Sequence, residues 1–153
     1  MTSSSPTATD AAAALAVPSL QTVLAGEHAA IYGYGVVGAH LRGRARSRAP
    51  AGYDVHRARR DQLRGLLVER GATPVAAAAG YALPRPVDSA GDATLLATEL
   101  EERIAAVWLD AVADLTGDLR ELAARVVQDA AVRAATWRGG SVPFPGLSEP
   151  PPS

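Results

Sequence analysis

The sequence predicts an all-α protein in which four amphipathic helices form a bundle and a long crossover joins the second helix to the third. Four segments carry apolar residues at three- and four-residue intervals, the period of one helix face. No segment shows the apolar–polar alternation of a half-buried strand. The connection over residues 71–92 contains Pro74, Pro84 and Pro86 and is long enough to run the length of a bundle. We therefore expect the second and third helices to be parallel.

The size and composition of the chain exclude several classes of protein. A chain of 153 residues is long enough for one domain with its own core. A net charge of -1 gives no general attraction to nucleic acid or to anionic membranes. Cysteine is absent, which excludes disulfides and thiolate metal ligands. The chain has neither a run of apolar residues long enough to span a membrane nor a secretory signal at its start, so we expect a cytoplasmic location.

The predicted domain covers residues 17–147, between two tails. Residues 1–16 are rich in Ser, Thr and Ala and are expected to be a disordered N-terminal tail, or helical only near its end. Residues 148–153 are expected to be a loose Pro-rich tail. Pro18 and Ser19 suit the start of the first helix, which we expect to run to about Arg46. In the C-terminal segment, Phe144 and Leu147 are expected to fold back onto the bundle.

The remaining helices follow from the same pattern. The second helix is predicted over residues 52–69, the third over 93–115 and the fourth over 119–137. A tight turn at Thr116-Gly117-Asp118 joins the last two. Within the crossover, residues 74–79 are expected to form a short helix.

Polar residues interrupt the apolar faces of these helices at similar depths. A carboxylate on an apolar face, such as Glu27, must find a cation, a metal ion or several hydrogen-bond donors, because burying it alone is too costly. In an antiparallel bundle such residues meet near the middle. The predicted buried network consists of Glu27, Tyr34, His56, Arg59, Arg60, Glu101, Asp129 and Arg133.

Several stretches of the chain resemble the ferritin-like superfamily, and more closely an actinobacterial ferritin-like domain of unknown function. They are EHAAIYGYG at 27–35, HRARRDQL at 56–63, YALPRP at 81–86, LATELEERIAA at 96–106, DAAVRAATWRG at 129–139 and FPG at 144–146. The resemblance covers most of residues 20–147 and implies a ferritin-like four-helix bundle with a crossover between helices two and three.

The chain departs from di-iron ferritins at the metal ligands. Those proteins place a Glu on each of two helices and Glu-x-x-His on each of the other two. Glu27 and Glu101 match the lone glutamates, but residues 56–59 and 129–132 lack the Glu-x-x-His pair. Arg59, Arg60 and Arg133 bring fixed positive charge and no lone pair. The sequence therefore predicts that the di-iron centre has been lost.

Three interpretations of the network remain open at this stage. In the first, the network is a neutralised structural element that fixes the helix register. In the second, it is a pocket that binds a small polar or anionic ligand through its arginines. In the third, it is a site for a single divalent metal ion. The metal ligands would then be Glu27, His56, Glu101 and Asp129, which suit zinc, iron or manganese.

The function favoured from the sequence is a non-enzymatic structural or binding role with no cofactor and no catalytic residues. A metal-dependent oxidoreductase or metal-handling protein of ferritin-like type is the alternative. We expect no nucleic-acid partner, and the Ala-rich helix faces leave room for a homodimer.

For polar and aromatic residues outside the predicted network, we expect ordinary surface or core positions. His28 is expected to be half-exposed, and Trp108 and Trp137 to be core aromatics. Asp61 is expected to pair on the surface with an arginine such as Arg57.

Overall fold

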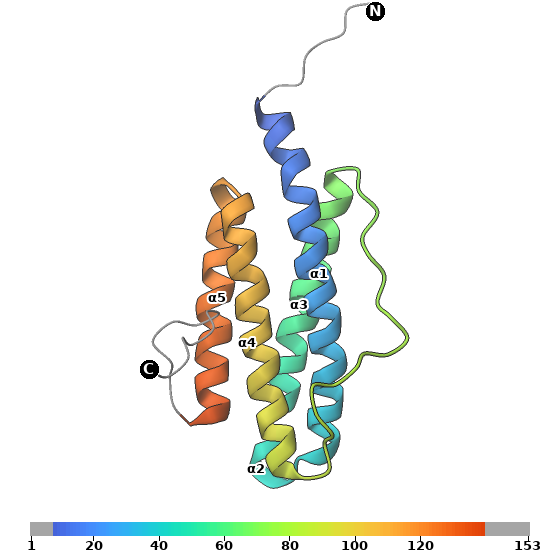
Figure 1. Cartoon of the computed structure of the whole chain (residues 1–153), viewed down its shortest axis with the longest axis vertical. Helices are drawn as coiled ribbons and strands as arrows, with labels where there is room; N and C mark the ends of the chain where they lie inside the picture. The colour runs from blue at the N-terminus through green and yellow to red at the C-terminus, as the bar shows by residue number, and fades with distance from the viewer. Residues whose placement is uncertain (1–7, 140–153) are drawn as a thin grey trace, which may run out of the picture.

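The computed structural model describes residues 8–139, and all regular secondary structure in that range is helical. Four long helices form a bundle, so the predicted all-α class is confirmed (Figure 1). The helices are α1 (Ala8–His40), α2 (Gly43–Arg46), α3 (Ala49–Glu69), α4 (Ala90–Asp114) and α5 (Gly117–Arg138).

The crossover between α3 and α4 sets the topology. α1 and α3 are antiparallel, because the single-turn helix α2 reverses the chain at one end of the bundle (Figure 1). The chain then returns along the outside of α1 before α4 begins, so α3 and α4 run parallel, as predicted (Figure 1). α5 packs antiparallel to α4 (Figure 1). Within residues 8–139, no helix combines the length and apolarity needed to cross a bilayer.

The first helix differs from its prediction at both ends. α1 begins at Ala8, so residues 8–16 are helical rather than a disordered tail, and Pro18 lies inside the helix. Alanine has the highest helix propensity, and the Ala-rich run outweighs the one backbone hydrogen bond that Pro18 removes. Ala16 is already buried in the core. The tail residues 1–7 and the C-terminal segment with Phe144, Leu147 and residues 148–153 lie outside the described range.

α1 ends at His40 rather than near Arg46. Arg42 is extended, and Gly43 has φ +57°, a left-handed conformation that glycine adopts without a steric penalty. The break lets the chain turn into α2 and α3. α3, α4 and α5 each begin a few residues before their predicted starts, and the hydroxyl of Ser89 caps α4 by accepting a hydrogen bond from Asp92 N.

The crossover contains no helix at residues 74–79, in contrast to the prediction. Side chains of α1 satisfy its backbone instead. Gln21 Nε2 donates to Thr73 O (2.7 Å), and Val75 N donates to Gln21 Oε1 (2.8 Å). His28 Nε2 lies 3.1 Å from Val75 O. These contacts hold the segment extended along α1, because they use the polar groups that a helical turn would need.

The core consists of two hydrophobic clusters. The first contains residues of α1 up to Ala30, together with Trp108 and Leu67. The second begins on α1 at Tyr34 and includes Leu96 and Trp137. A layer of buried polar side chains lies where the two clusters meet.

Candidate functional site

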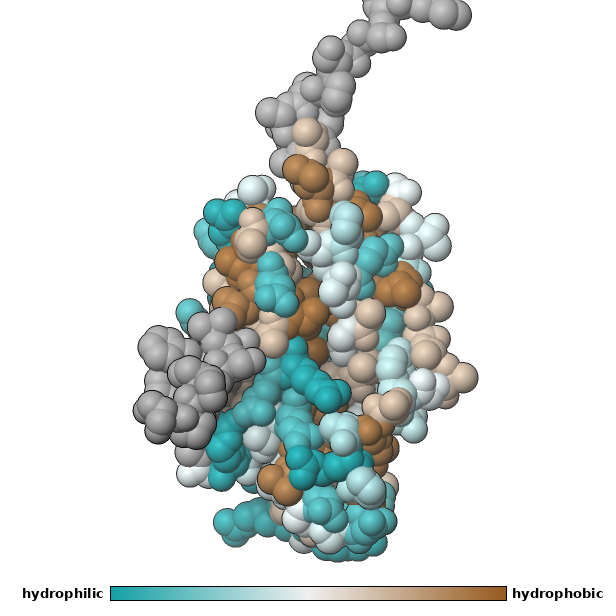
Figure 2. All heavy atoms as spheres, in the orientation of Figure 1, coloured by the Kyte–Doolittle hydropathy of each residue, from teal (hydrophilic) through white to brown (hydrophobic). Residues whose placement is uncertain are grey.

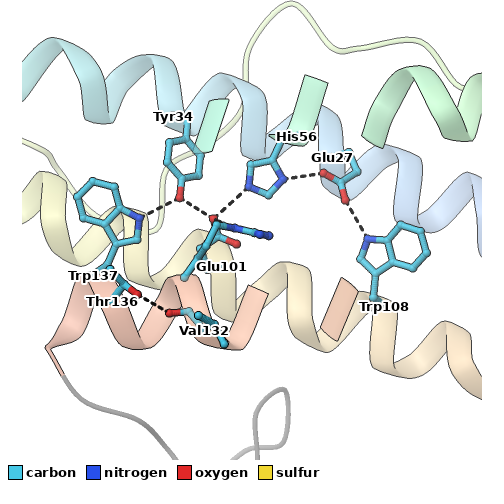
Figure 3. Close-up of polar contacts among 9 residues, drawn as sticks. Glu27, Tyr34, His56, Glu101, Trp108, Val132, Thr136 and Trp137 are labelled. Atoms are coloured by element: carbon cyan, nitrogen blue, oxygen red, sulfur yellow. Dashed lines mark hydrogen bonds and ion pairs between the residues drawn. The ribbon is translucent and has the colours of Figure 1, made fainter. Parts of the chain in front are cut away.

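Glu27 on α1 is the first member of this buried polar network. Its side chain is 1% exposed. The indole Nε1 of Trp108, on α4, donates to Glu27 Oε1 at 2.9 Å (Figure 3). The imidazole Nδ1 of His56, on α3, lies 2.7 Å from Glu27 Oε2 (Figure 3). The carboxylate therefore has a partner on each oxygen, and each partner comes from a different helix.

Glu101 on α4 is the second buried carboxylate, with 0% of its side chain exposed. Its Oε1 accepts a hydrogen bond from the Tyr34 hydroxyl at 2.5 Å and one from Arg133 Nε at 2.9 Å. His56 Nε2 lies 3.2 Å from the same oxygen (Figure 3). Glu101 Oε2 and Arg133 Nη2 are buried and have no hydrogen-bond partner among the described residues.

His56 bridges the two carboxylates with its two ring nitrogens. An ionised carboxylate only accepts hydrogen bonds, so both nitrogens must carry a proton for both contacts to form. The bridge is then an imidazolium. Burial by itself lowers the pKa of His56, but the hydrogen bonds and charges of Glu101 and Glu27 outweigh it, so the pKa lies above its ordinary value of 6.5.

The other ionisable members of the network respond to the same surroundings. Burial tends to raise the pKa of Glu101, but the hydrogen bonds and positive charges of His56 and Arg133 prevail and hold the pKa below its usual value. Burial, followed by the charge of Glu101, raises the pKa of Tyr34. The Tyr34 hydroxyl therefore keeps its proton and remains a donor to Glu101.

The position of Tyr34 depends on a glycine and a tryptophan. A Cβ atom on Gly52 of α3 would lie 2.2 Å from Tyr34 Cε1, so only glycine leaves room for the ring. Trp137 Nε1, near the end of α5, donates to the Tyr34 hydroxyl at 3.0 Å (Figure 3). Tyr34 therefore connects α1 with α4 and α5.

Two arginines bring positive charge to the network. Arg133, 23% exposed, extends from α5 to Glu101. The Arg59 guanidinium on α3 lies 5.7 Å from the centroid of a Trp108 ring. Burial lowers the pKa of Arg59, the charge of Glu27 opposes that shift, and the charge of Arg133 adds to it. Arg59 therefore contributes charge to the site without a hydrogen bond to either buried glutamate.

Two predicted network residues lie elsewhere. Arg60 pairs with Asp61, with Nη2 to Oδ1 at 2.8 Å, so the prediction for Arg60 is wrong and Asp61 does not pair with Arg57. Asp129 is exposed. The buried residues of α5 include Val126 and Ala130 instead. Successive residues of an α-helix are rotated by about 100°, so Asp129 points away from the inward face that Ala130 occupies.

Three other residues correct the sequence interpretation. His28 is 8% exposed rather than half-exposed, because the crossover covers it. Trp108 and Trp137 were expected only to pack, yet each donates its indole N–H to the network. Both roles could have been predicted from the sequence. A buried indole N–H needs a hydrogen-bond acceptor, and both tryptophans occupy helical positions that face the polar layer.

Four long helices with buried carboxylates between them define a ferritin-like bundle. Within that class, the chain belongs to the family described as "Domain of unknown function (DUF4439)", whose model matches residues 19–149. The resemblance stated from the sequence is thereby confirmed. A comparison with curated proteins found no match.

The solved structures that are similar to this chain include the following two. One is a conserved hypothetical protein, rv2844, from Mycobacterium tuberculosis, with a TM-score of 0.79 and 38% identity over 82% of this chain and 96% of that chain. The other is described as ferritin like, diiron-carboxylate proteins from Bacillus anthracis str. Ames, with a TM-score of 0.71 and 14% identity over 84% of this chain and 96% of that chain. At that identity the second likeness shows the fold alone.

The residues in the network do not fit the di-iron centre that the fold class implies. Among residues 8–139, no group of three or more His, Asp or Glu side chains is arranged to hold a metal ion. Both nitrogens of His56 are engaged, and one oxygen of Glu101 has three donors directed at it, including Arg133. A guanidinium and an imidazolium supply protons where a metal centre needs lone pairs.

Proposed function

We propose that this chain is a non-enzymatic, ferritin-like structural or binding protein in which a network of charges replaces the di-iron centre. The observation that carries the proposal is the bridge of His56 between Glu27 and Glu101. An imidazolium in this position positions two carboxylates and, together with Arg133, neutralises them, which is the structural part of what a metal ion does in a bundle core.

The charge balance supports a network without metal. Glu27 and Glu101 contribute two negative charges, and His56 and Arg133 contribute two positive charges when His56 is protonated. Arg59 adds a further positive charge nearby. Dications placed here would face two guanidiniums and would first have to displace the protons of His56, so the site favours protons over metal.

The arrangement also accounts for a structural role. Each of the four long helices contributes a charged side chain to one connected layer: Glu27 on α1, His56 on α3, Glu101 on α4 and Arg133 on α5. Sliding or rotating one helix would strand a buried charge. The layer therefore selects one helix register out of the many that Ala-rich faces permit.

Metal analysis of protein purified without a His-tag tests the proposal. We expect iron, zinc and manganese well below one ion per chain, no ferroxidase activity, and an unchanged melting temperature when Fe(II) is added anaerobically. A di-iron ferritin-like protein handled in parallel serves as the positive control. Binding of about two iron ions per chain after reconstitution would overturn the proposal.

A single divalent ion is the second candidate, since Glu27, His56 and Glu101 are suitable ligand types and each carboxylate lies within hydrogen-bond reach of His56. Calorimetric titration with Zn(II) and Mn(II) distinguishes the two candidates. One ion per chain, with binding lost in His56→Gln, would favour this second candidate. Sedimentation of the same samples tests the predicted homodimer.

A further inference from the structure

A small cavity lies apart from the buried network, on the side of the bundle that the crossover covers. Its volume is about 180 Å³, and its walls come from α1, α4 and residues 81–84 of the crossover. In Figure 1 the crossover passes over α1 close to α4. Figure 2 shows hydrophobic residues in the furrow between α4 and α1, and hydrophilic residues lower in the same view.

Small side chains on α1 create the space. Gly26, Ala29 and Ala30 line one wall, and Leu100, Ile104 and Val107 of α4 line the opposite wall. These residues offer only apolar side chains to an occupant. A site of about 150 Å³ with such a lining is large enough for benzene, so this cavity accommodates one ring or a short branched chain.

An aromatic pair lines the cavity, with Tyr32 contributed by α1 and Tyr81 by the crossover. The rings of Tyr32 and Tyr81 lie 5.6 Å apart between centroids and are tilted by 51°. Ala78 N donates to the Tyr81 hydroxyl at 3.0 Å, which holds that side chain in place. Tyr32 is 40% exposed, so this aromatic edge is open to an arriving molecule.

Arg103 supplies the only charge in the cavity lining. It is exposed and forms no ion pair or hydrogen bond with any described residue. The carboxylates nearest to it along α4 have other partners, since Glu99 pairs with Arg85 and Glu102 with Arg138. An apolar cavity with an exposed, unpaired arginine in its lining is complementary to a small apolar molecule with one negative group.

We propose that this cavity is a binding site for a small carboxylate with a compact apolar body, whose anionic group pairs with Arg103. The apolar body lies between the small residues of α1 and the aliphatic residues of α4. The proposal goes beyond the structural role of the network, because it concerns a different part of the fold and requires neither metal nor His56.

A matched pair of probes tests the site. 3-Phenylpropanoate and 3-phenylpropan-1-ol have similar apolar bodies and differ in the anionic group. In a titration followed by ¹H–¹⁵N NMR, we expect the acid to shift the amides of Gly26, Ala29 and Ala82 and to bind about tenfold more tightly than the alcohol, the scale of one charge-assisted contact. Binding of both probes with equal affinity, or no shifts at these amides, would overturn the proposal.

Three variants complete the test. Arg103→Gln should weaken binding of the acid about tenfold and leave the alcohol unchanged. Arg64→Gln, an exposed change on α3, should alter neither. Ala29→Leu should fill the cavity and block both probes. If Ala29→Leu does not fold, the Arg103 comparison decides alone: unchanged affinity for the acid in Arg103→Gln contradicts the proposal.

Discussion

His56 Nδ1 lies 2.7 Å from Glu27 Oε2, and each side chain is 1% exposed. This pair joins α3 to α1 at the layer where the two hydrophobic clusters meet. Because both groups are shielded from bulk solvent, each depends on the other for its charge to be tolerated. Changes at this pair should therefore alter the unfolding free energy, its dependence on pH, and the binding of metal ions.

Glu27→Ala should be strongly destabilising. It leaves the imidazolium of His56 and the indole N–H of Trp108 without their acceptor. Breaking a buried pair typically costs about 3–5 kcal/mol, a large part of the about 5–15 kcal/mol by which a domain is stable. Urea denaturation measures the loss directly.

Two further variants control for this result. Glu27→Gln should cost less than Glu27→Ala, since it retains the shape and an acceptor oxygen. Glu69→Ala, at the exposed end of α3, should leave the unfolding free energy nearly unchanged. If Glu27→Ala and the wild type have the same unfolding free energy, the buried position of Glu27 is wrong.

The unfolding free energy should depend on the charge of His56. Its pKa is raised by folding, so its contribution is complete below about pH 6.5, falls as pH rises above that value, and is lost once pH passes the folded-state pKa. Glu101, whose pKa is lowered, acts on the acid side: its contribution is present above its unfolded pKa and is lost as pH falls through the folded pKa.

Denaturation of wild type and His56→Gln over a pH series isolates the His56 contribution. The groups around His56 are Glu27 and Tyr34 of α1, Arg59 of α3, Glu101 of α4 and Arg133 of α5, and all are present in both proteins. The stability gap between the two proteins should shrink as pH rises above about 6.5. A gap that stays constant as pH rises would contradict a protonated His56 in the folded protein.

Gly52→Ala and Gly65→Ala should have opposite effects, although both lie in α3. The new Cβ at position 52 would overlap the Tyr34 ring and displace its hydroxyl from Glu101. At position 65 nothing lies within 4 Å of the new Cβ, so alanine should stabilise the helix by about 0.4–1 kcal/mol. Thermal melts compare the two, and equal effects would mean that Tyr34 does not pack against α3.

Gln21→Ala should loosen the crossover without unfolding the bundle. It removes the two contacts of Gln21 with Thr73 and Val75, while the contact of His28 with Val75 O remains. We expect faster amide exchange at Val75 and a stability loss of about 1 kcal/mol, measured by hydrogen exchange and denaturation. Gln62→Ala, an exposed change on α3, is the control. Unchanged exchange at Val75 would show that Gln21 does not hold the crossover.

Most of the fold was predictable because it depends on local patterns. Apolar residues at the helical period define one inward face for each helix, and the length of the Pro-containing connection permits α3 and α4 to be parallel. The segment at 74–79 was mispredicted because its backbone is satisfied by Gln21 and His28, which are remote in sequence. Local propensity contains no information about such partners.

The candidate site divides in the same way. The sequence by itself determined that Glu27, His56 and Glu101 occupy apolar faces, and that a carboxylate there requires a partner. Only the tertiary structure decided which partners meet: Arg133 rather than Arg60 reaches Glu101. A single residue rotates a helix face by about 100°, so small differences in helix orientation separate a buried contact from an exposed side chain. Those orientations are set by packing between helices, which the pattern within one helix does not determine.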